Sequence, residues 1–503
     1  MTSTSVVEIA SLIGARLSGD SSVVVTGVSL DSTAIQEGEL FAALPGRSVH
    51  GARFVEQAIQ RGASAILTDP SGIQLMEEFE ISPSTPVLEV IDPRACLGEV
   101  CALVYGDPAS ELIMIGVTGT NGKSTTTSMI YQAARAVGIS AGLIGTLATL
   151  INDEKIVSAR TTPEAPDLFR TLARMKAAGV KIVAMEVSSI ALSEHRVNGL
   201  KFDCVAFTNL SHDHLDYHVS MPEYFAAKAQ LFTPKFARFA LICTDGPWGI
   251  ELIELCEKVV IPYESVGSLD SVAAPNWKLS PLSDASSRSS WIISGPRDEI
   301  RLDALALPGK INALNAALAL SILDHVGIRG HEVVEAICSA TVPGRGELVG
   351  TRGDVSFFVD YAHSPESVAE FLTGLKSEFS GRVITVLGAG GDRDASKRAT
   401  MGSVGASLSD ILIITDDNPR SEDPAEIRKQ ILEGVAEFPG SQVIEIGDRR
   451  NAIARALELA GGHDVVAILG KGHERGQEIM GQTIAFSDVD VVAGLLGDKG
   501  SHD

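Results

Sequence analysis

The sequence predicts an α/β protein of three domains: a small α/β unit, a central parallel sheet with a phosphate-binding loop, and a Rossmann-like unit. A chain of 503 residues, 45% of them hydrophobic, exceeds one core, and domain statistics favour about three domains of 100 to 200 residues. Apolar strands alternate with helical segments along the chain, as in a parallel sheet covered on both faces. In the last third, the apolar strands end in loops dense in glycine and polar residues, which predicts a ligand-binding face.

The composition excludes several classes of partner. A formal net charge of -23 argues against nucleic acid or an anionic membrane, because such partners need a basic face. Small anionic ligands remain compatible with this charge, since they need only a few local cations and backbone amides. The six cysteines form no CxxC pair, so we expect reduced thiols without a metal role.

The beginning of the chain favours a cytoplasmic protein. It lacks the basic segment and the unbroken apolar stretch of a secretion signal, and Ser5 with Glu8 fits a helix-capping box. No stretch of the sequence stands out as a transmembrane helix. We expect a monomer.

Turn-forming residues divide the chain into three parts. The first domain, residues 1–107, holds no obvious catalytic cluster, and turn formers gather at 105–108 just before the strand LIMIGVTG. The second domain covers 108–343 and the third 344–503. Within the second, the Ser- and Pro-rich stretch 267–296 interrupts the rhythm of strands and helices, which predicts a hairpin or loop at the edge of that domain.

The strongest local signal is a phosphate-binding loop between the strand LIMIGV and a helical run. Its glycines let backbone amides approach phosphates, Lys123 would lie between the β- and γ-phosphates, and Ser124 would bind Mg²⁺. Val117 occupies the first glycine position of the strict motif, and an ordinary glycine turn is the structural alternative. The expected loop residues are Gly119, Thr120, Asn121, Gly122, Lys123, Ser124 and Thr125.

Further metal-binding candidates follow downstream. Glu186 ends the apolar strand KIVAMEV and is the expected carboxylate of that Mg²⁺, the alternative being an edge carboxylate in solvent. Histidines and aspartates alternate at 212–218, without cysteines or HExxH spacing, so a hard-metal or substrate role fits better than zinc. Lys228 falls on the expected helix PEYFAAKAQLF, where spacing alone predicts a solvated lysine.

Taken together, GVTGTNGKSTTT, MEVSS, FTNLSHDHLDYH with EYFAAKAQLF, and KINALNAALA resemble the Mur ligases, over nearly the whole chain. Folylpolyglutamate synthases share the phosphate loop and the metal chemistry. TTPE before MEVSS, with DNPR and GKGHE, resembles in particular the members that add meso-diaminopimelate to UDP-N-acetylmuramoyl-L-alanyl-D-glutamate in peptidoglycan synthesis. The resemblance implies ATP, two Mg²⁺ ions and an acyl phosphate, which the amine of diaminopimelate attacks to form an amide.

The resemblance also implies roles for single residues. It assigns His214 to the second Mg²⁺, and Lys228 would be carbamylated, which gives it oxygens for the metal. His212 and His218 are expected to be solvated or core-capping. The implied metal ligands are Ser124, Glu186, His214 and Lys228. The implied nucleotide contacts beyond the loop are Asn315, Arg345 and Asp360.

Substrate positions are implied in all three domains. The uridine diphosphate would lie near Leu30, Ser32 and Arg47. The muramoyl peptide would contact Thr161, Thr162, Ser188, Glu194 and Arg196. Diaminopimelate would contact Arg393, Asp417, Asn418, Pro419, Arg420, Gly470 and Glu474, where arginines suit carboxylates and acids or carbonyls suit ammonium groups. The chain departs from the family pattern at Thr33, Arg160 and Ile190, where arginine, asparagine and histidine are usual.

Alternatives remain at two levels. Asp417, Asn418 and Pro419 could simply form a turn, and a Mur-family ligase that adds L-lysine would not need Arg420, because lysine lacks a distal carboxylate. A P-loop nucleotide switch would account for Lys123 but has no need for DNPR and GKGHE. ATP hydrolysis without the UDP-muramoyl dipeptide would support the switch.

Overall fold

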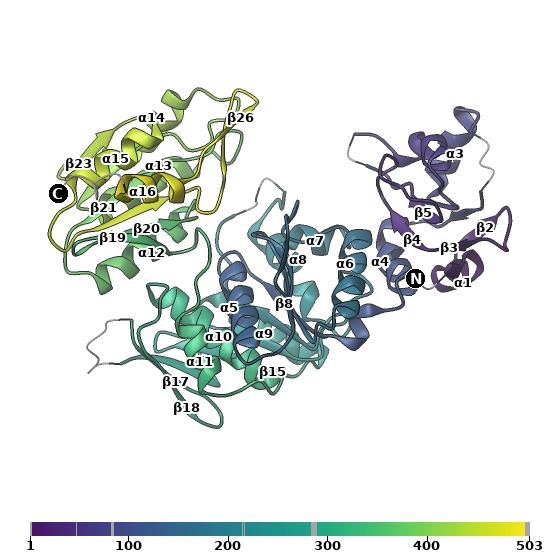
Figure 1. Cartoon of the computed structure of the whole chain (residues 1–503), viewed down its shortest axis with the longest axis horizontal. Coiled ribbons are helices and arrows are strands. Elements are labelled where there is room, and N and C mark those ends of the chain that lie inside the picture. The colour runs from purple at the N-terminus through teal and green to yellow at the C-terminus, as the bar shows by residue number, and fades with distance from the viewer. Residues whose placement is uncertain are drawn as a thin grey trace.

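The computed structural model of the chain describes residues 3–46, 48–81, 85–213, 215, 217–282 and 289–497. Three large β-sheets with flanking helices follow one another along the chain, which confirms the predicted three-domain α/β fold (Figure 1). Figure 1 shows the first unit at the right, the central unit in the middle and the last unit at the upper left. None of the helices in the described ranges is both long and apolar enough to cross a membrane.

The first unit is a five-stranded sheet in the order β2-β7-β6-β5-β4, parallel except for the edge strand β2. Its strands are β2 Arg16–Ser18, β4 Gly27–Ser29, β5 Glu39–Ala42, β6 Ala65–Thr68 and β7 Val87–Glu89, with a separate pair of β1 Thr4–Ser5 and β3 Val24–Val25. Its helices are α1 Val6–Ile13, η1 Gly51–Phe54, α2 Val55–Gln60, α3 Pro70–Glu78, α4 Pro93–Val104 and η2 Pro108–Glu111. The expected capping box is present, since Ser5 and Glu8 exchange side-chain and backbone hydrogen bonds at the start of α1.

The central unit is an eleven-stranded sheet in the order β11-β10-β9-β12-β8-β13-β14-β15-β16-β17-β18. Its strands are β8 Ile113–Thr118, β9 Ala141–Ile144, β10 Thr149–Ile151, β11 Glu154–Ile156, β12 Ile182–Glu186, β13 Cys204–Phe207, β14 Ala240–Cys243, β15 Tyr263–Ser268, β16 Trp277–Pro281, β17 Trp291–Ser294 and β18 Glu299–Leu302. Its helices are α5 Lys123–Ala136, α6 Ala165–Ala177, α7 Ser189–Ser193, α8 Met221–Ala229, η3 Gln230–Phe232, α9 Pro247–Val259, α10 Lys310–His325 and α11 His331–Cys338.

The seven central strands, β9-β12-β8-β13-β14-β15-β16 in sheet order, run parallel. Antiparallel strands extend the sheet at both edges, β10 and β11 at one and β17 and β18 at the other. The antiparallel pairing of β16, β17 and β18 confirms the hairpin that the Ser- and Pro-rich stretch predicts at the domain edge. Because β8, β12 and β13 are neighbouring parallel strands, their carboxyl ends meet at one edge of the sheet. The phosphate loop and Glu186 follow these ends.

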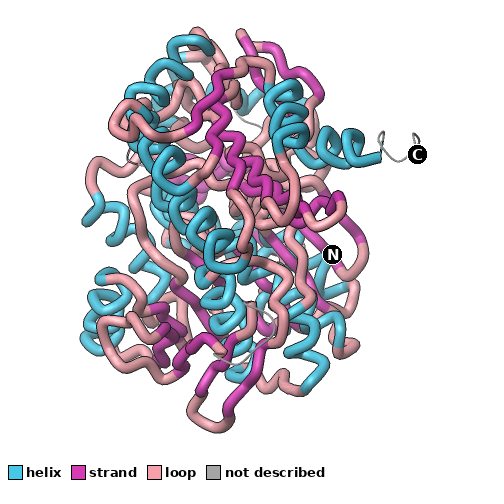
Figure 2. The backbone as a smooth tube through the Cα atoms, turned by 90° about the vertical axis from the view of Figure 1, so that its left-hand side faces the viewer, coloured by secondary structure: helices cyan, strands magenta, loops and turns pink. Residues whose placement is uncertain are grey.

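The last unit is a six-stranded sheet in the order β19-β20-β24-β21-β22-β23, antiparallel only between β19 and β20. Its strands are β19 Glu347–Arg352, β20 Val355–Asp360, β21 Val383–Leu387, β22 Ile411–Ile414, β23 Gln442–Glu445 and β24 Val465–Leu469, followed by the hairpin β25 Gly476–Ile479 and β26 Gln482–Ala485. Its helices are α12 Pro365–Glu378, α13 Lys397–Leu408, α14 Pro424–Val435, α15 Arg449–Leu459 and α16 Asp488–Gly497. Figure 2 views this side of the molecule and shows helices flanking the strands on both sides.

The hydrophobic cores join the first two units and leave the third separate. One cluster of buried side chains runs without a break from Val6 and Leu97 in the first unit to Phe169 and Ile242 in the central unit. The two clusters of the last unit contain only residues of that unit, between Val355 and Val492. Hydrogen bonds cross this second boundary, as from the backbone of Gly309 to the carboxylate of Glu378 at 2.6 Å.

Candidate active site

Two lysines meet at the phosphate-binding loop between β8 and α5. Lys123, the first residue of α5, donates from Nζ to the carbonyl oxygens of Gly119 and Thr120, both at 2.9 Å. Lys228 of α8 donates to the same Gly119 oxygen at 2.8 Å. Both lysines line a cavity of about 160 Å³ above the loop, together with Asn121 and Ser124. The loop and its lysine therefore stand where the motif predicts them.

Burial controls the charge of these two amines. It lowers the pKa of Lys123, whereas the nearby carboxylate of Glu186 raises it. Lys228 is 2% exposed, and burial lowers its pKa well below the ordinary value, with the cation of Lys123 lowering it further. The solvated position that helix spacing alone predicts for Lys228 is wrong, because α8 turns this side chain toward the loop.

Glu186, the last residue of β12, places its carboxylate in the same cavity. It is 2% exposed and accepts hydrogen bonds from the backbone amide and the hydroxyl of Thr146, at 2.8 and 3.0 Å. A side chain at Gly145 would place its Cβ 2.3 Å from Oε1, so only glycine fits there. The alternative of an edge carboxylate in solvent is therefore wrong. With the hydroxyl of Ser124 in the same cavity, these oxygens fit the ligands that Mg²⁺ prefers.

The histidine-rich stretch is only partly described. His214, the expected second metal ligand, lies outside the described residues. His218 is buried, with its Nε2 2.9 Å from the hydroxyl of Ser189 and its ring stacked on Tyr224, which confirms a core-capping position. His212 is exposed. Over the part of the chain that the structure describes, no three His, Cys, Asp or Glu side chains form a preassembled metal cluster.

The threonines implied for the muramoyl peptide lie beside Glu186. Thr161 and Ser188 line the cavity, and the hydroxyl of Thr161 is 2.9 Å from that of Thr146. Thr162 is 1% exposed, donates to the backbone oxygen of Glu186 at 2.9 Å and accepts from the amide of Ser188 at 3.1 Å. Thr162 thus links the backbone of Glu186 to that of Ser188.

A second cavity of about 60 Å³ continues the first along α10. Asn315 and Asp360 line it, and Arg345 lines both cavities. Gly122 has a φ of +85°, and a Cβ there would lie 2.4 Å from Oδ1 of Asn315, so glycine permits this approach. Arg345 lies over the ring of Tyr361 at 4.3 Å. The structure therefore brings the three expected nucleotide residues of the second and third domains together.

Asp360 is fixed by backbone amides at the end of β20. It accepts hydrogen bonds from Gly346 at 2.6 Å and from Ala362 at 2.7 Å. Burial raises its pKa, and the guanidinium of Arg345 opposes this. The carboxylate is therefore pre-oriented at the rim of the smaller cavity.

A wide cavity of about 880 Å³ lies between the first and central units. Leu30 and Ser32 line it, and the hydroxyl of Ser32 donates to Gln57 at 2.8 Å. Arg47 lies outside the described residues. Arg94, Arg160 and Arg170 also line this cavity, which therefore offers cations that suit an anionic ligand.

Glu194 and Arg196 form ion pairs with two residues that line this wide cavity. Arg196 forms an ion pair with Glu164 at 2.9 Å, and Arg94 reaches both Glu164 and Glu194 at 3.4 Å. Glu194 also accepts from the hydroxyl of Tyr217 at 2.9 Å. This ion-pair network gives the boundary between the first two units fixed charges.

The DNPR loop (417–420) after β22 and the GKGHE loop (470–474) after β24 meet through a fully buried lysine. Lys471 donates from Nζ to Oδ1 of Asn418 at 2.9 Å and to Oε2 of Glu474 at 3.0 Å. Asn418 donates from Nδ2 to the same Glu474 oxygen at 2.8 Å. Asp417 and Asn418 are each 7% exposed and bonded across loops, so they do not lie in an exposed surface turn.

Other residues implied for diaminopimelate lie around this contact. Gly470 has a φ of +113° and faces Oδ2 of Asp417, a buried oxygen without a hydrogen-bond partner among the described residues. Pro419 is buried, and Arg393 is exposed in the loop after β21. Arg420 donates to the carbonyl oxygen of Gly391 at 2.6 Å and forms an ion pair with Glu478 at 3.0 Å.

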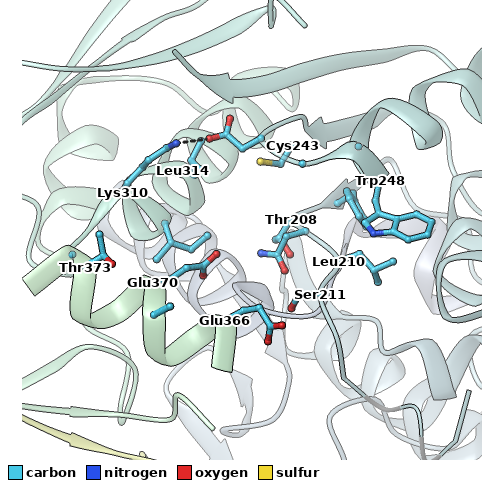
Figure 3. Close-up of a pocket in the computed structure, with 18 of the residues that line it drawn as sticks. Thr208, Leu210, Ser211, Cys243, Trp248, Lys310, Leu314, Glu366, Glu370 and Thr373 are labelled. Atoms are coloured by element: carbon cyan, nitrogen blue, oxygen red, sulfur yellow. Dashed lines mark ion pairs between the residues drawn. The ribbon is translucent and has the colours of Figure 1, made fainter. Parts of the chain in front are cut away.

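A cavity of about 640 Å³ lies between the central and last units, next to the residues expected to contact the nucleotide (Figure 3). Figure 3 shows Glu366 and Glu370 of α12 on one side and Trp248 of α9 on the other. Burial, and after it the nearby carboxylate of Glu366, raise the pKa of Glu370 to about 7, although Lys310 opposes this shift. Lys310 itself is paired with Asp245 at 3.0 Å.

Sequence reasoning missed four residues at these sites. Thr146 orients Glu186, and Lys471 joins the DNPR loop to the GKGHE loop. Tyr361 and His363 belong to the third unit and line the cavity above the phosphate-binding loop. Burial lowers the pKa of His363, which favours a neutral imidazole. Tyr361 and His363 lie within the motif VDYAHSPES, so a signal was present for them, whereas Thr146 stands in no motif.

Comparison with known proteins places nearly the whole chain in one protein family. Models of the Mur ligase family catalytic domain, the Mur ligase middle domain and the Mur ligase glutamate ligase domain match residues 24–105, 117–323 and 344–472. The chain is 40% identical to a UDP-N-acetylmuramyl-tripeptide synthetase of Leifsonia xyli over 98% of this chain and 96% of the relative. It is equally identical, with the same coverage, to a UDP-N-acetylmuramoyl-L-alanyl-D-glutamate--2,6-diaminopimelate ligase of Streptomyces coelicolor.

Solved structures agree with this placement. The chain is similar to a UDP-N-acetylmuramoyl-L-alanyl-D-glutamate--2,6-diaminopimelate ligase with a TM-score of 0.71 and 27% identity, covering 99% of this chain and 100% of the other. It shares its fold with a MurF ligase of Thermotoga maritima solved with ADP, at a TM-score of 0.62 and 16% identity, covering 94% of this chain and 97% of the other.

Proposed function

The chain belongs to the Mur ligase family, and on this premise we propose that it is the MurE-type enzyme, which joins meso-diaminopimelate to UDP-N-acetylmuramoyl-L-alanyl-D-glutamate. The reaction is the ATP-dependent formation of an amide bond between an acid and an amino acid in peptidoglycan synthesis. The choice of diaminopimelate is supported by the names of relatives that are about 40% identical and by the DNPR and GKGHE loops.

One observation carries the proposal. The cavity above the phosphate loop joins Lys123 and Glu186 of the second domain with Arg345 and His363 of the third. A γ-phosphate on Lys123 and a carboxylate substrate beside Ser188 would therefore face the domain that presents the amino acid. We propose domain boundaries at 1–107, 108–343 and 344–503, because each range contains one complete large sheet.

The chemistry proceeds in two steps. An oxygen of the D-glutamate γ-carboxylate attacks the γ-phosphorus of ATP, the bond to ADP breaks, and Lys123 stabilises the charge of the transferring phosphoryl group. The product is an acyl phosphate. The neutral amine of diaminopimelate attacks its carbonyl carbon, the tetrahedral intermediate expels phosphate, and the nitrogen loses a proton. Closure of the third domain over the cavity would exclude water from the acyl phosphate.

Mg²⁺ fits the donors that line this cavity. Ser124 and Glu186 would hold one ion, and His214 with a carbamylated Lys228 would hold the second. Bound Mg²⁺ would offset the negative charge of the phosphates. A neutral Lys228 favours carbamylation, because the uncharged amine forms a bond to the carbon of CO₂ and releases a proton.

The remaining substrate contacts follow the cavities. We propose that Leu30, Ser32 and Arg47 bind the uridine diphosphate, and that Thr161, Glu194 and Arg196 position the peptide with Thr162 and Ser188. Asn315, Arg345 and Asp360 would contact the nucleotide. Diaminopimelate would bind Arg393, Asp417, Asn418, Pro419, Arg420, Gly470 and Glu474. We also expect the protein to be cytoplasmic and monomeric.

The decisive experiment is the mass of the product. The chain is incubated with ATP, Mg²⁺, UDP-N-acetylmuramoyl-L-alanyl-D-glutamate and meso-diaminopimelate, and a tripeptide product with stoichiometric ADP is expected. In parallel, L-lysine replaces diaminopimelate, and comparable rates would refute the choice of amino acid. ATP hydrolysis without any peptide product would refute the ligase itself and favour a nucleotide switch.

A further inference from the structure

An ion pair lies at the edge of the amino-acid site, and one member has no role in the function proposed above. Arg420 Nε and Glu478 Oε2 are 3.0 Å apart, and their side chains are 22% and 46% exposed. Arg420 closes the DNPR loop, whereas Glu478 belongs to β25, the first strand of the hairpin that follows the GKGHE loop. Both side chains are therefore partly exposed to solvent beside the two loops.

Backbone contacts hold Glu478 beside the DNPR loop. Its amide donates to Oδ1 of Asn418 at 3.0 Å, and its carbonyl oxygen accepts from the amide of Arg420 at 2.9 Å. The amide of Met480 donates in turn to the carbonyl oxygen of Arg420 at 2.6 Å. Because these bonds use backbone atoms of the hairpin, the position of residue 478 does not depend on its own carboxylate.

The other two acids of the site are less exposed than Glu478. Oε2 of Glu474 accepts from both Lys471 and Asn418. Asp417 is 7% exposed, and its Oδ2 lies 3.9 Å from the buried guanidinium of Arg449. Glu478 is thus the most exposed of the three acids and the one that forms an ion pair with Arg420.

A guanidinium and a carboxylate side by side match the distal end of diaminopimelate. That end carries a carboxylate and an ammonium group on one carbon, so it can replace one protein ion pair by two charge-assisted hydrogen-bonded pairs. We propose, resting on the proposed function, that Glu478 is a specificity-determining residue that binds the distal ammonium group while Arg420 binds the distal carboxylate. The pair opens on binding, and an amino acid with only one of the two groups leaves one member without its ligand.

Glu478 should also weaken the binding of amino acids that carry only one of the two distal groups. An amino acid with a distal carboxylate but no ammonium group must displace Glu478 from Arg420 and leaves that acid unpaired. Lysine pairs with Glu478 but leaves Arg420 only its bond to Gly391. Both losses favour the zwitterionic end over either half of it.

The test uses the full-length enzyme with the variant Glu478→Gln and three amino acids. These are meso-diaminopimelate, L-2-aminopimelate, which lacks the distal ammonium group, and L-lysine, which lacks the distal carboxylate. For meso-diaminopimelate we measure kcat/KM, and for the other two the inhibition constant against it. Glu478→Gln should lower kcat/KM about 10- to 100-fold and weaken L-lysine by a similar factor, whereas L-2-aminopimelate should bind as well as before or better.

Two further variants serve as controls. Glu478→Asp keeps the charge and should retain more of the kcat/KM than Glu478→Gln. Asp490→Asn removes the same charge from an exposed, weak pair with Arg475 and should leave all three amino acids unchanged. Thermal unfolding of each variant checks that it folds.

Several results would overturn the proposal. An equal loss with all three amino acids would mean a structural role for Glu478. Higher kcat/KM for meso-diaminopimelate in Glu478→Gln would mean that Glu478 only competes for Arg420, and no change would mean no role. A wild-type enzyme that forms no product with meso-diaminopimelate refutes the proposed function instead, so the two failures are distinguishable.

Discussion

Lys123 and Lys228 donate hydrogen bonds to one and the same oxygen, the carbonyl of Gly119, at 2.9 and 2.8 Å. Two ammonium groups that share one hydrogen-bond acceptor repel each other strongly in a buried site. The pKa of each is lowered by burial, and Lys228 gives up its proton more readily because Lys123 lies beside it. The geometry therefore assigns the positive charge to Lys123 and an uncharged amine to Lys228.

Replacement of Lys228 by methionine separates catalysis from stability. Ligation should fall at least about 100-fold, because the metal would lose its carbamate ligand. Stability at pH 7 should rise by about 1–3 kcal/mol, since the folded state no longer has to release a proton that the unfolded state binds. Stability in the wild type should increase as pH rises toward 10.5, and this slope should be smaller in the variant. Unfolding by denaturant at several pH values measures both effects.

Lys258→Met is the matched control for this variant, because Lys258 is exposed on α9. It should change neither ligation nor the pH slope. Mass spectrometry of the native wild type in bicarbonate buffer should find one added CO₂, which Lys228→Met should lack. Full ligation by Lys228→Met would contradict the assignment.

Gly122→Ala tests the approach of the loop to Asn315. Alanine at this position has an unfavourable φ of +85°, and its Cβ would lie 2.4 Å from Oδ1 of Asn315. We expect ATP to bind at least about 10-fold more weakly, as measured by calorimetry. Gly138→Ala is the control, because Gly138 has a φ of +77° but nothing within 4 Å of a Cβ. It should cost about 1 kcal/mol of stability and leave ATP binding unchanged.

Thr146→Val removes one of the two hydrogen bonds that orient Glu186. The backbone amide of residue 146 still donates at 2.8 Å, so the carboxylate stays in place but is held less firmly. The Mg²⁺ concentration for half-maximal ligation should rise about 10-fold, as for other residues that orient a metal ligand. Thr149→Val, which removes a 3.3 Å contact with Ser158 just after β11, should not change it. A Mg²⁺ requirement that stays the same in both variants would argue against Glu186 as a ligand.

Asp488→Asn breaks the most deeply buried ion pair of the last unit. Asp488 and Arg449 are both 0% exposed, with a shortest distance of 2.7 Å. Loss of the carboxylate charge leaves the buried guanidinium with only the weaker pair to Asp417, at 3.9 Å, which should destabilise the third domain by about 3–5 kcal/mol. Glu458→Gln removes an exposed pair with Arg455 and should cost less than about 1 kcal/mol. Equal losses in the free energy of unfolding, measured with denaturant, would show that burial does not determine how much the pair contributes to stability.

Glu370→Gln tests the cavity between the second and third domains. With a pKa of about 7, Glu370 holds its proton more tightly in the folded than in the unfolded protein. The wild type should therefore gain stability as the pH falls from 7 toward 4.5, and above pH 7 the charged carboxylate opposes folding. Glu370→Gln should raise stability above pH 7 by at most about 1 kcal/mol, because solvent reaches this side chain, and should have little effect near pH 5. Glu251→Gln, on the exposed surface of α9, should show no such pH dependence.

Residues that belong to a local pattern could be predicted from the sequence. The phosphate loop is written in consecutive residues, and Glu186 ends an apolar strand that parallel pairing brings next to that loop. The hairpin at 267–296 is marked by its Ser and Pro content. Each of these features is recognised from a short run of neighbouring residues, so the local sequence is enough to predict it.

Residues that depend on distant contacts could not be predicted. Spacing alone makes Lys228 a surface lysine, because its burial comes from the packing of α8 against a loop about a hundred residues earlier. Thr146 acts on Glu186 through a fold that brings β9 beside β12, and no motif marks it. Glu478 meets Arg420 only because a hairpin folds back over the DNPR loop.

The unbroken core of the first two units has a consequence for how the chain is made. A ribosome delivers residues 1–343 first, and these contain every side chain of the shared core, so the two domains can settle together before the third has left the exit tunnel. The third unit, whose cores use only residues between 349 and 496, takes no core side chain from residues 1–343. Two separately expressed polypeptides, divided near residue 343, should therefore each fold and reassemble into a working enzyme when mixed.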